Sequence, residues 1–180
     1  TMDALAGLLE TLKKQGVIKQ DSFAFYVDDG SSDATWSIIQ ERHESDPACK
    51  GLKLAGNVGH QNALAAGMLE VRSQVDCIIS LDADLQDDIY AVPAMLKHYA
   101  EGCDIVYGVR NCRDTDTAFK RATAGLFYKL MALLKVRMVS QHADYRLVSR
   151  VALDAFSLYN ESSMFLRGIF PSMGFRSATV

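Results

Sequence analysis

The sequence predicts an α/β domain in which a mostly parallel central sheet carries helices on both faces. Short apolar runs rich in β-branched residues alternate with amphipathic runs through about residue 110, which is typical of β-α-β units with right-handed crossovers. The turns after these apolar runs are rich in Gly, Asp and Asn, and ligands bind at this edge of open α/β sheets. At 180 residues the chain is long enough to bury the core of a single domain.

The elements follow from the spacing of apolar residues. Residues 2–15 predict an amphipathic helix because Leu5, Leu8, Leu9 and Leu12 share one face, and Gly16 is suited to end it. The predicted strands are 23–27, 52–55, 77–81, 104–110, 144–148 and 175–180. Further helices are expected at about 33–45, from the 59–60 loop onward, from Pro93, and at 116–137 and 150–158.

Composition excludes several classes of protein. Hydrophobic residues make up 49% and charged residues 23% of the chain, and the net charge of −3 gives no electrostatic basis for binding nucleic acid. The four cysteines lack C-x-x-C spacing, which favours reduced thiols in a cytosolic setting. No apolar run reaches the roughly 20 residues that a membrane-spanning helix needs.

The stretch 77–87 is the main functional signal, because an apolar strand ends in several acidic residues. Asp82 and Asp84 are two residues apart, so in extended backbone their carboxylates point to the same side and repel unless a cation lies between them. Oxygen ligands at this position suit Mg²⁺ or Mn²⁺, which normally also takes phosphate oxygens. The alternative is an acidic turn that caps the next helix. One Asp would suffice for that, so we favour a metal–diphosphate site.

Two other loops fall on the same predicted edge. The segment Asp28-Asp29-Gly30-Ser31 can accept hydrogen bonds from a base imide or ribose hydroxyls, and Gly30 allows close backbone approach. A turn with a helix cap explains this segment equally well. Asn57 and Gly59 are a weaker signal, and His60 is interpreted as a polar residue of the first helical turn rather than a catalytic one.

Basic residues in the second half are candidate anion contacts, since guanidinium groups match phosphate oxygens. Arg146 adjoins Asp144 at the expected rim, and a structural Asp–Arg pair is an alternative of comparable weight. Arg167 either contacts a second substrate or caps a helix. The charges of the 116–137 helix are most simply a solvated face, with contact to an anionic membrane surface as a weaker alternative. The candidate anion contacts are Arg110, Lys120, Arg121 and Arg146.

Several motifs together resemble the family-2 inverting glycosyltransferases. They are the segments 27–33 (VDDGSSD), 57–64 (NVGHQNAL) and 82–87 (DADLQD). The segments 107–110 (YGVR) and 144–147 (DYRL) narrow the resemblance to the branch of dolichyl-phosphate mannose synthase and bacterial polyprenyl-phosphate glycosyltransferases. The motifs occur in order over nearly the whole chain, and their combination is far more specific than any one of them.

The resemblance implies a GT-A fold, a nucleotide-diphosphate sugar donor and Mg²⁺ or Mn²⁺ as cofactor. It places the nucleobase and ribose at Asp28 and Asp29, the metal and diphosphate at Asp82, Asp84 and Gln86, and the reaction centre at Asp144 and Arg146. The full set of expected nucleotide-sugar-binding residues is Asp28, Asp29, Gly30, Ser31, Asn57, Gly59, Asp82, Ala83 and Asp84. The acceptor phosphate is expected at Arg110, Lys120, Arg121 and Arg146.

The chain departs from the family pattern at its ends. The family's opening strand is absent before Thr1, and the basic segment and membrane helices that often follow the catalytic domain are absent after Val180. We therefore expect one catalytic domain truncated at both ends, with a nucleotide-binding part at about 1–110 and an acceptor-side part at about 111–180. For the full-length protein we expect the cytoplasmic face of a membrane, and the oligomeric state stays open.

The acceptor decides the expected mechanism. A polyprenyl phosphate is already anionic and needs little base assistance, so Arg146 with Arg121 or Lys120 would position it. A sugar hydroxyl of a cell-envelope polysaccharide needs a general base, for which Asp144 is the best candidate. Two other classes are alternatives. A phosphohydrolase in which Asp82 attacks phosphate is disfavoured by the Leu85-Gln86 that follows, whereas a nucleotide-sugar-binding module without turnover is plausible because the family's first strand is missing.

Overall fold

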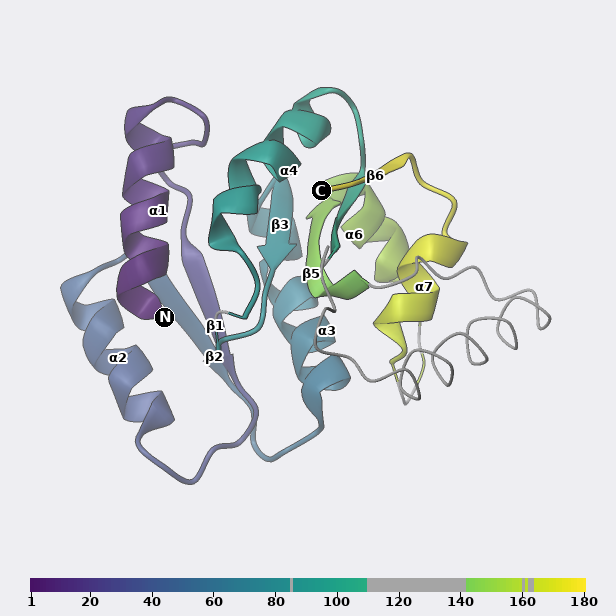
Figure 1. The fold of residues 1–180 in the computed structure, drawn as a ribbon. Helices are drawn as coiled ribbons and strands as arrows, with labels where there is room; N and C mark the ends of the chain where they lie inside the picture. Colours follow the sequence, from purple (N-terminus) through teal and green to yellow (C-terminus); the bar gives the residue numbers. More distant parts are fainter. Residues whose placement is uncertain (85, 110–141, 160, 162–163) are drawn as a thin grey trace, which may run out of the picture.

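The computed structural model describes residues 1–84, 86–109, 142–159, 161 and 164–180 (Figure 1). The helix predicted at 116–137 lies outside the described residues. The first half contains α1 (Met2–Lys14), β1 (Ala24–Asp28), α2 (Thr35–Ser45), β2 (Cys49–Lys53), α3 (His60–Val71), the short η1 (Arg72–Gln74) and β3 (Cys77–Ser80). The second half contains η2 (Ile89–Ala91), α4 (Val92–Ala100), β4 (Ile105–Val109), β5 (His142–Ser149), α6 (Arg150–Phe156), α7 (Leu166–Ser172) and β6 (Ser177–Thr179).

The strands of the described residues form two sheets. β1 and β2 pair in parallel, and a four-stranded sheet has the order β3-β5-β4-β6. β5 is antiparallel to both β3 and β4, whereas β4 and β6 are parallel. Three of these four strands therefore run in one direction, as the sequence predicts, and the reversed β5 between them is the feature that the sequence did not reveal.

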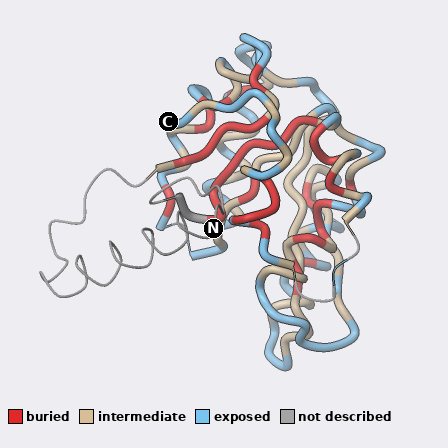
Figure 2. The backbone as a smooth tube through the Cα atoms, turned by 90° about the vertical axis from the view of Figure 1, so that its right-hand side faces the viewer, coloured by how far each residue is buried: buried red, intermediate tan, exposed pale blue. Residues whose placement is uncertain are grey.

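Helices cover both faces of the four-stranded sheet, which confirms the expected layering. Alternate residues of β4 and β5 face opposite sides, so each side acquires its own core. On one side Ile105, Tyr107 and Val148 pack with α3, α6 and α7. On the other side Val106, Tyr145 and Leu147 pack with α1 and α4. The buried backbone lies in the middle of the molecule (red in Figure 2).

The β1–β2 pair is also covered on both faces. A side chain at Gly51 would meet Ile39 of α2, and one at Gly67 of α3 would lie 2.5 Å from the Val27 side chain of β1. The small residues therefore let both helices approach the pair closely. Because α3 contacts β1 and also contributes Ala65 and Met68 to the core of the other sheet, it joins the two sheets.

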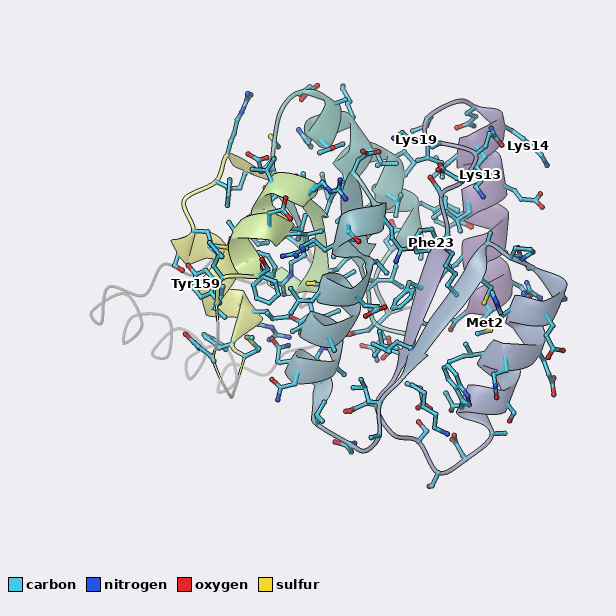
Figure 3. The ribbon with its side chains drawn as sticks, turned by 180° about the vertical axis from the view of Figure 1, so that it is seen from behind. Met2, Lys13, Lys14, Lys19, Phe23 and Tyr159 are labelled. Atoms are coloured by element: carbon cyan, nitrogen blue, oxygen red, sulfur yellow. The ribbon has the colours of Figure 1, made fainter. Side chains whose placement is uncertain are left out.

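The first helix ends as predicted. Gly16 adopts a left-handed φ of 69°, and the N–H groups of Gly16 and Val17 donate to the carbonyls of Lys13 and Leu12, which is the Schellman arrangement. Lys13 and Lys14 lie in the last turn, where positive charge complements the helix dipole (Figure 3). Lys19, nearby in the same view, forms an ion pair of 2.6 Å with Asp76.

Candidate active site

The reversed direction of β5 brings the two acidic segments of the sequence together. β3 ends at Ser80, which pairs with Arg146 of β5, so the residues that follow β3 lie beside the beginning of β5. The Ser80 hydroxyl donates to the backbone carbonyl of Asp144 at 2.6 Å. Asp82 and Asp144 are therefore neighbours at one edge of the sheet, although 62 positions separate them in the sequence.

Asp144 is buried and fully engaged by donors. Its side chain is 3% exposed and accepts hydrogen bonds from Arg146 and Arg167, the latter at 3.0 Å to Oδ2. Gln61 Nε2 donates to the same oxygen at 2.8 Å, and His60 Nε2 lies 3.1 Å from it. Four side chains from three segments thus converge on one carboxylate.

These contacts decide the charge of Asp144. Burial alone would raise its pKa, because the charged form loses solvation. The hydrogen bond from Arg167, the charges of Arg146 and Arg167, and the contact with His60 act in the opposite direction and together lower the pKa below its ordinary value. Asp144 is therefore an ionised carboxylate near neutral pH and a weak base.

Arg146 lies beneath Asp144 and has no exposed surface. Its guanidinium donates to Asp144 and, at 3.2 Å, to the carbonyl of Leu166, and it stacks 5.2 Å from the centre of the Phe170 ring. A phosphate cannot reach this guanidinium without displacing its neighbours. In this geometry Arg146 orients Asp144, as in the structural Asp–Arg pair considered from the sequence.

Arg167 provides the accessible positive charge of this cluster. It is the second residue of α7, its side chain is 46% exposed, and both Nε and Nη2 face the Asp144 carboxylate. The sequence left open whether Arg167 contacts a substrate or caps a helix. Its exposed guanidinium at the sheet edge leaves it able to bind an anion from solvent.

The acidic turn after β3 is built differently from the expectation of extended backbone. β3 ends at Ser80, and Ala83 and Asp84 lie in a turn. The Asp82 side chain is 37% exposed, with Oδ1 3.7 Å from His60 Nε2, whereas Ala83, Asp84 and Gln86 are exposed. Asp84 accepts a hydrogen bond from the Gln86 N–H at 3.1 Å, which holds the turn.

The acidic turn carries oxygen donors of the kind that bind Mg²⁺. Within the part of the chain that the structure describes, no three His, Cys, Asp or Glu side chains form a metal-binding group. Mg²⁺ is commonly held by one or two carboxylates together with substrate phosphates and water. Asp82 and Asp84 are accessible carboxylates two positions apart, which matches the number of carboxylates in that donor set, and Gln86 is also exposed.

Hydrogen bonds join the two loops that are predicted to bind the nucleotide, 28–31 and 57–59. Asp28 is buried; its Oδ1 accepts from the Ser31 N–H at 3.0 Å, and its Oδ2 has no hydrogen-bond partner among the described residues. Asp29 accepts from the N–H groups of Val58 at 2.7 Å and Gly59 at 3.0 Å. Asp29 thus fixes the loop before α3, and Asp28 holds the turn after β1 through the Ser31 N–H.

Gly30 is required where the two loops meet. Its φ is 70°, and a Cβ there would lie 2.5 Å from the backbone of Gly56. No larger residue fits without moving one of the loops. Asn57 Oδ1 accepts from the Gly59 N–H at 3.1 Å and stabilises the turn into α3. Asp33 accepts from the Thr35 N–H at 2.9 Å, but the cap position of α2 is Ala34, which makes no side-chain cap hydrogen bond.

Sequence reasoning missed the first turn of α3. His60 was interpreted as a polar residue of that turn, yet its ring lies between Asp82 and Asp144. Gln61 and Asn62 were part of a motif without a role, and both bond to backbone N–H groups of the segment 164–166. Three consecutive polar residues at a helix start were the available signal. Arg110, Lys120 and Arg121, the other predicted anion contacts, lie outside the described residues.

The sequence model of glycosyl transferase family 2 matches residues 3–156. The chain belongs to this family. It is similar to the uncharacterized glycosyltransferase YkoT of Bacillus subtilis strain 168, with 47% identity over all of this chain and 53% of that protein. It is also 36% identical to the bactoprenol glucosyl transferase of Shigella phage SfX, over 83% of this chain and 48% of that protein.

A prophage bactoprenol glucosyl transferase homolog of Escherichia coli K12 is 37% identical over 83% of this chain and 48% of its own length. The chain thus spans about half the length of the curated relatives that it matches. Among the residues with described structure, no helix has the length and apolar character needed to cross a bilayer.

Proposed function

We propose that this chain is the catalytic domain of an inverting, metal-assisted glycosyltransferase that moves a sugar from a nucleotide-diphosphate sugar to a polyprenyl phosphate. One relative is named a bactoprenol glucosyl transferase and another a homolog of such an enzyme, and bactoprenol is a polyprenyl lipid, which supports this acceptor class. The donor side would comprise the 28–31 and 57–59 loops and the acidic turn, within residues of about 1–110. The acceptor side would include Arg167, within residues of about 111–180.

One observation favours a phosphate acceptor over a hydroxyl acceptor: the Asp144 carboxylate is already filled with donors. A sugar hydroxyl must lose its proton to a base, and the lowered pKa of Asp144 makes it unsuited to that task. His60, Gln61, Arg146 and Arg167 occupy its oxygens as well. A phosphate acceptor near neutral pH carries a negative oxygen and needs no base.

The proposed step is a single displacement at the anomeric carbon. An oxygen of the acceptor phosphate forms the new C–O bond while the bond from the same carbon to the nucleoside diphosphate breaks. The electron pair of the broken bond goes to the departing diphosphate oxygen, and no proton moves. Arg167 would hold the acceptor phosphate, while Asp144 orients the Arg167 guanidinium and limits the positive charge that the cluster presents.

Asp82, Asp84 and Gln86 would hold the metal. A bound Mg²⁺ or Mn²⁺ stabilises the negative charge that develops on a departing diphosphate. His60 lies between Asp82 and Asp144 and would hold the donor side and the acceptor side in a fixed position relative to each other. A polyprenyl phosphate resides in a bilayer and nucleotide sugars in the cytoplasm, so we place the reaction at the cytoplasmic face of a membrane.

The intact gene product should be incubated with a panel of nucleotide sugars, Mn²⁺ or Mg²⁺, and two matched acceptors, a polyprenyl phosphate and the corresponding polyprenol. We expect glycolipid product, followed by mass spectrometry, with the phosphate alone and only in the presence of metal. Transfer to the polyprenol or to a neutral glycan, with none to the phosphate, would contradict the proposed acceptor. Donor binding without transfer to any acceptor would favour a binding module instead.

A further inference from the structure

We propose that Gln61 is a positioning residue that fixes the Asp144 carboxylate and the start of α7 relative to each other, so that Arg167 presents its guanidinium to the acceptor. This role rests on the proposed function, since it concerns the same transfer step. Gln61 is the second residue of α3 and is partly buried. It does not itself contact the reacting groups in this proposal.

The hydrogen bonds of Gln61 belong to a closed ring. Its Nε2 donates to Asp144 Oδ2 at 2.8 Å, and its Oε1 accepts from the Leu166 N–H at 3.2 Å. The Leu166 carbonyl accepts from Arg146 Nη1 at 3.2 Å, and Arg146 Nη2 donates back to Asp144. One residue at the start of α7, Leu166, is thus held at both its N–H and its carbonyl by side chains that also bond Asp144.

Arg167 is the residue immediately after this fixed position. Its guanidinium returns to Asp144 Oδ2 at 3.0 Å, the same oxygen that Gln61 contacts. A shift of the Leu166 backbone would therefore move Arg167 away from the sheet edge. Since side chains on short helices depend on such tertiary contacts for their position, the ring sets where the accessible cation lies.

The chemistry of the ring requires a carboxamide at position 61. Asp144 is ionised and can only accept, whereas the Leu166 N–H can only donate, so the bridging group must donate on one side and accept on the other. A Gln side chain does both without charge. A Glu of the same shape keeps the acceptor for Leu166 but turns an oxygen toward the Asp144 carboxylate, where two negative charges repel.

The same turn of α3 reaches the predicted nucleotide loop. Asn62, the next residue, donates to the Val58 carbonyl at 3.0 Å and accepts from the Met164 N–H at 3.2 Å. The N–H of Val58 is in turn held by Asp29. The start of α3, which carries Gln61, is therefore held by the predicted nucleotide loop. The two hydrogen bonds of Gln61 then fix Asp144 and the start of α7 relative to that loop.

The test compares Gln61→Glu with Gln40→Glu in the intact protein. Gln40 lies on the exposed side of α2, so the control makes the same chemical change away from this edge. At about pH 8 we expect Gln61→Glu to raise the KM for the polyprenyl phosphate by at most about tenfold, the effect expected for complete loss of the Arg167 contact, because the Arg167 guanidinium is displaced rather than removed. The KM for the nucleotide sugar should stay within about threefold, since the donor loops are unchanged.

The pH dependence separates positioning from damage to the fold. The Asp144 carboxylate opposes ionisation of a Glu at position 61, whereas Arg146 and Arg167, and His60 once it is protonated, favour it. The protonated acid has the shape and the donor of Gln. The ratio of the acceptor KM in Gln61→Glu to that in wild type should therefore shrink as the pH falls and the Glu becomes protonated. Gln61→Met, which forms neither hydrogen bond and carries no charge, should have a deficit that does not change with pH.

The outcomes distinguish this inference from the proposed function. An active wild-type enzyme together with a Gln61→Glu variant of unchanged acceptor KM would overturn the role of Gln61 alone. A deficit in Gln61→Glu that stays constant across pH, as in Gln61→Met, would also overturn it, because the loss would then reflect packing. A wild-type protein that transfers no sugar from any donor contradicts the proposed function, and with it this inference.

Discussion

The acidic turn after β3 and Asp144 on β5 are neighbours, yet they are stabilised in opposite ways. Asp144 is 3% exposed and receives hydrogen bonds from residues of α3, β5 and α7. Asp82 is 37% exposed and, among the residues that the structure describes, lies 3.7 Å from His60, and Asp84 bonds to the backbone N–H of Gln86. The fold has satisfied one carboxylate internally and left the other two accessible.

This difference has a physical consequence. A buried charge is tolerated only when it is paired and hydrogen-bonded, so the donors around Asp144 belong to the stability of the domain. An accessible carboxylate is hydrated and requires no partner from the protein, so Asp82 and Asp84 can exchange water for a cation and its phosphate ligands. Substitutions at the two places should therefore separate loss of stability from loss of activity.

The largest effect is expected for Asp144→Asn. The substitution leaves the fully buried Arg146 without its counter-charge, and breaking a buried ion pair in this way costs about 3–5 kcal/mol of unfolding free energy. Denaturant unfolding followed by circular dichroism would measure it. A change below about 1 kcal/mol would place Asp144 among weakly coupled surface charges and end the contrast with Asp82.

The pH dependence of stability provides a control for this prediction. The pKa of Asp144 is lowered in the folded state, so its contribution to stability is present above its unfolded value of about 3.9 and is lost as the pH falls below it. Wild-type stability should decline below about pH 4, and Asp144→Asn should lack that part of the decline. Parallel acid-unfolding curves for the two proteins would contradict the assignment.

The next effect is expected for Asp82→Asn, and it should appear in activity rather than stability. Removal of one carboxylate from the proposed metal and diphosphate site should lower kcat about 100-fold or more, the size of effect seen when one stabilising group at a developing charge is lost. Titration calorimetry should show weaker Mn²⁺ binding in the presence of a nucleoside diphosphate. The unfolding free energy should stay within about 1 kcal/mol of wild type, because Asp82 is accessible.

Much of the fold could be predicted from the sequence because apolar periodicity is local. The helix over Met2–Lys14 and the strands around Ala24–Asp28 and Ile105–Val109 lie where the pattern places them. The direction of β5 could not be predicted in the same way, since the alternation of apolar and polar residues is the same in a parallel and in an antiparallel strand. Its antiparallel insertion between β3 and β4 depends on contacts between residues far apart in sequence.

The candidate site likewise contains some residues that local sequence patterns predict and others that only the tertiary structure reveals. The sequence predicts acidic residues at strand ends, and the spacing of the motifs marks three of them as site candidates: Asp82, Asp84 and Asp144. The roles of Gln61 and Arg167 depend on the meeting of α3, β5 and α7, which no local pattern encodes. The burial of Arg146 is also a tertiary property: the sequence gives its charge but not the ring of Phe170 or the Leu166 carbonyl that enclose it.

A moderate effect is expected for Arg167→Ala, which removes the accessible cation from the Asp144 cluster. The KM for the polyprenyl phosphate should rise about tenfold, as expected for loss of a charge-assisted contact worth roughly 1.5–3 kcal/mol that is partly screened by solvent. The matched control is Arg176→Ala, an exposed Arg just before β6. An unchanged acceptor KM in Arg167→Ala would remove Arg167 from the proposed acceptor site.

The smallest effect is expected for Tyr145→Phe, on the face of β5 opposite Asp144. The Tyr145 hydroxyl donates to the Asp88 carbonyl at 2.9 Å and so holds the end of the segment that carries Asp82 and Asp84. Burial raises the pKa of this hydroxyl, which keeps it a neutral donor, and loss of one such bond costs about 0.5–1.5 kcal/mol.

For Tyr145→Phe we therefore expect a small drop in unfolding free energy and a weaker affinity for Mn²⁺ with nucleoside diphosphate, while Asp144 and its donors keep their positions. Gly108→Ala tests the same contact from the other side, because a Cβ there would lie 2.3 Å from the Tyr145 ring and push it away. If Tyr145→Phe raised the acceptor KM and left metal affinity unchanged, the assignment of Tyr145 to the metal side and of Asp144 to the acceptor side would be wrong.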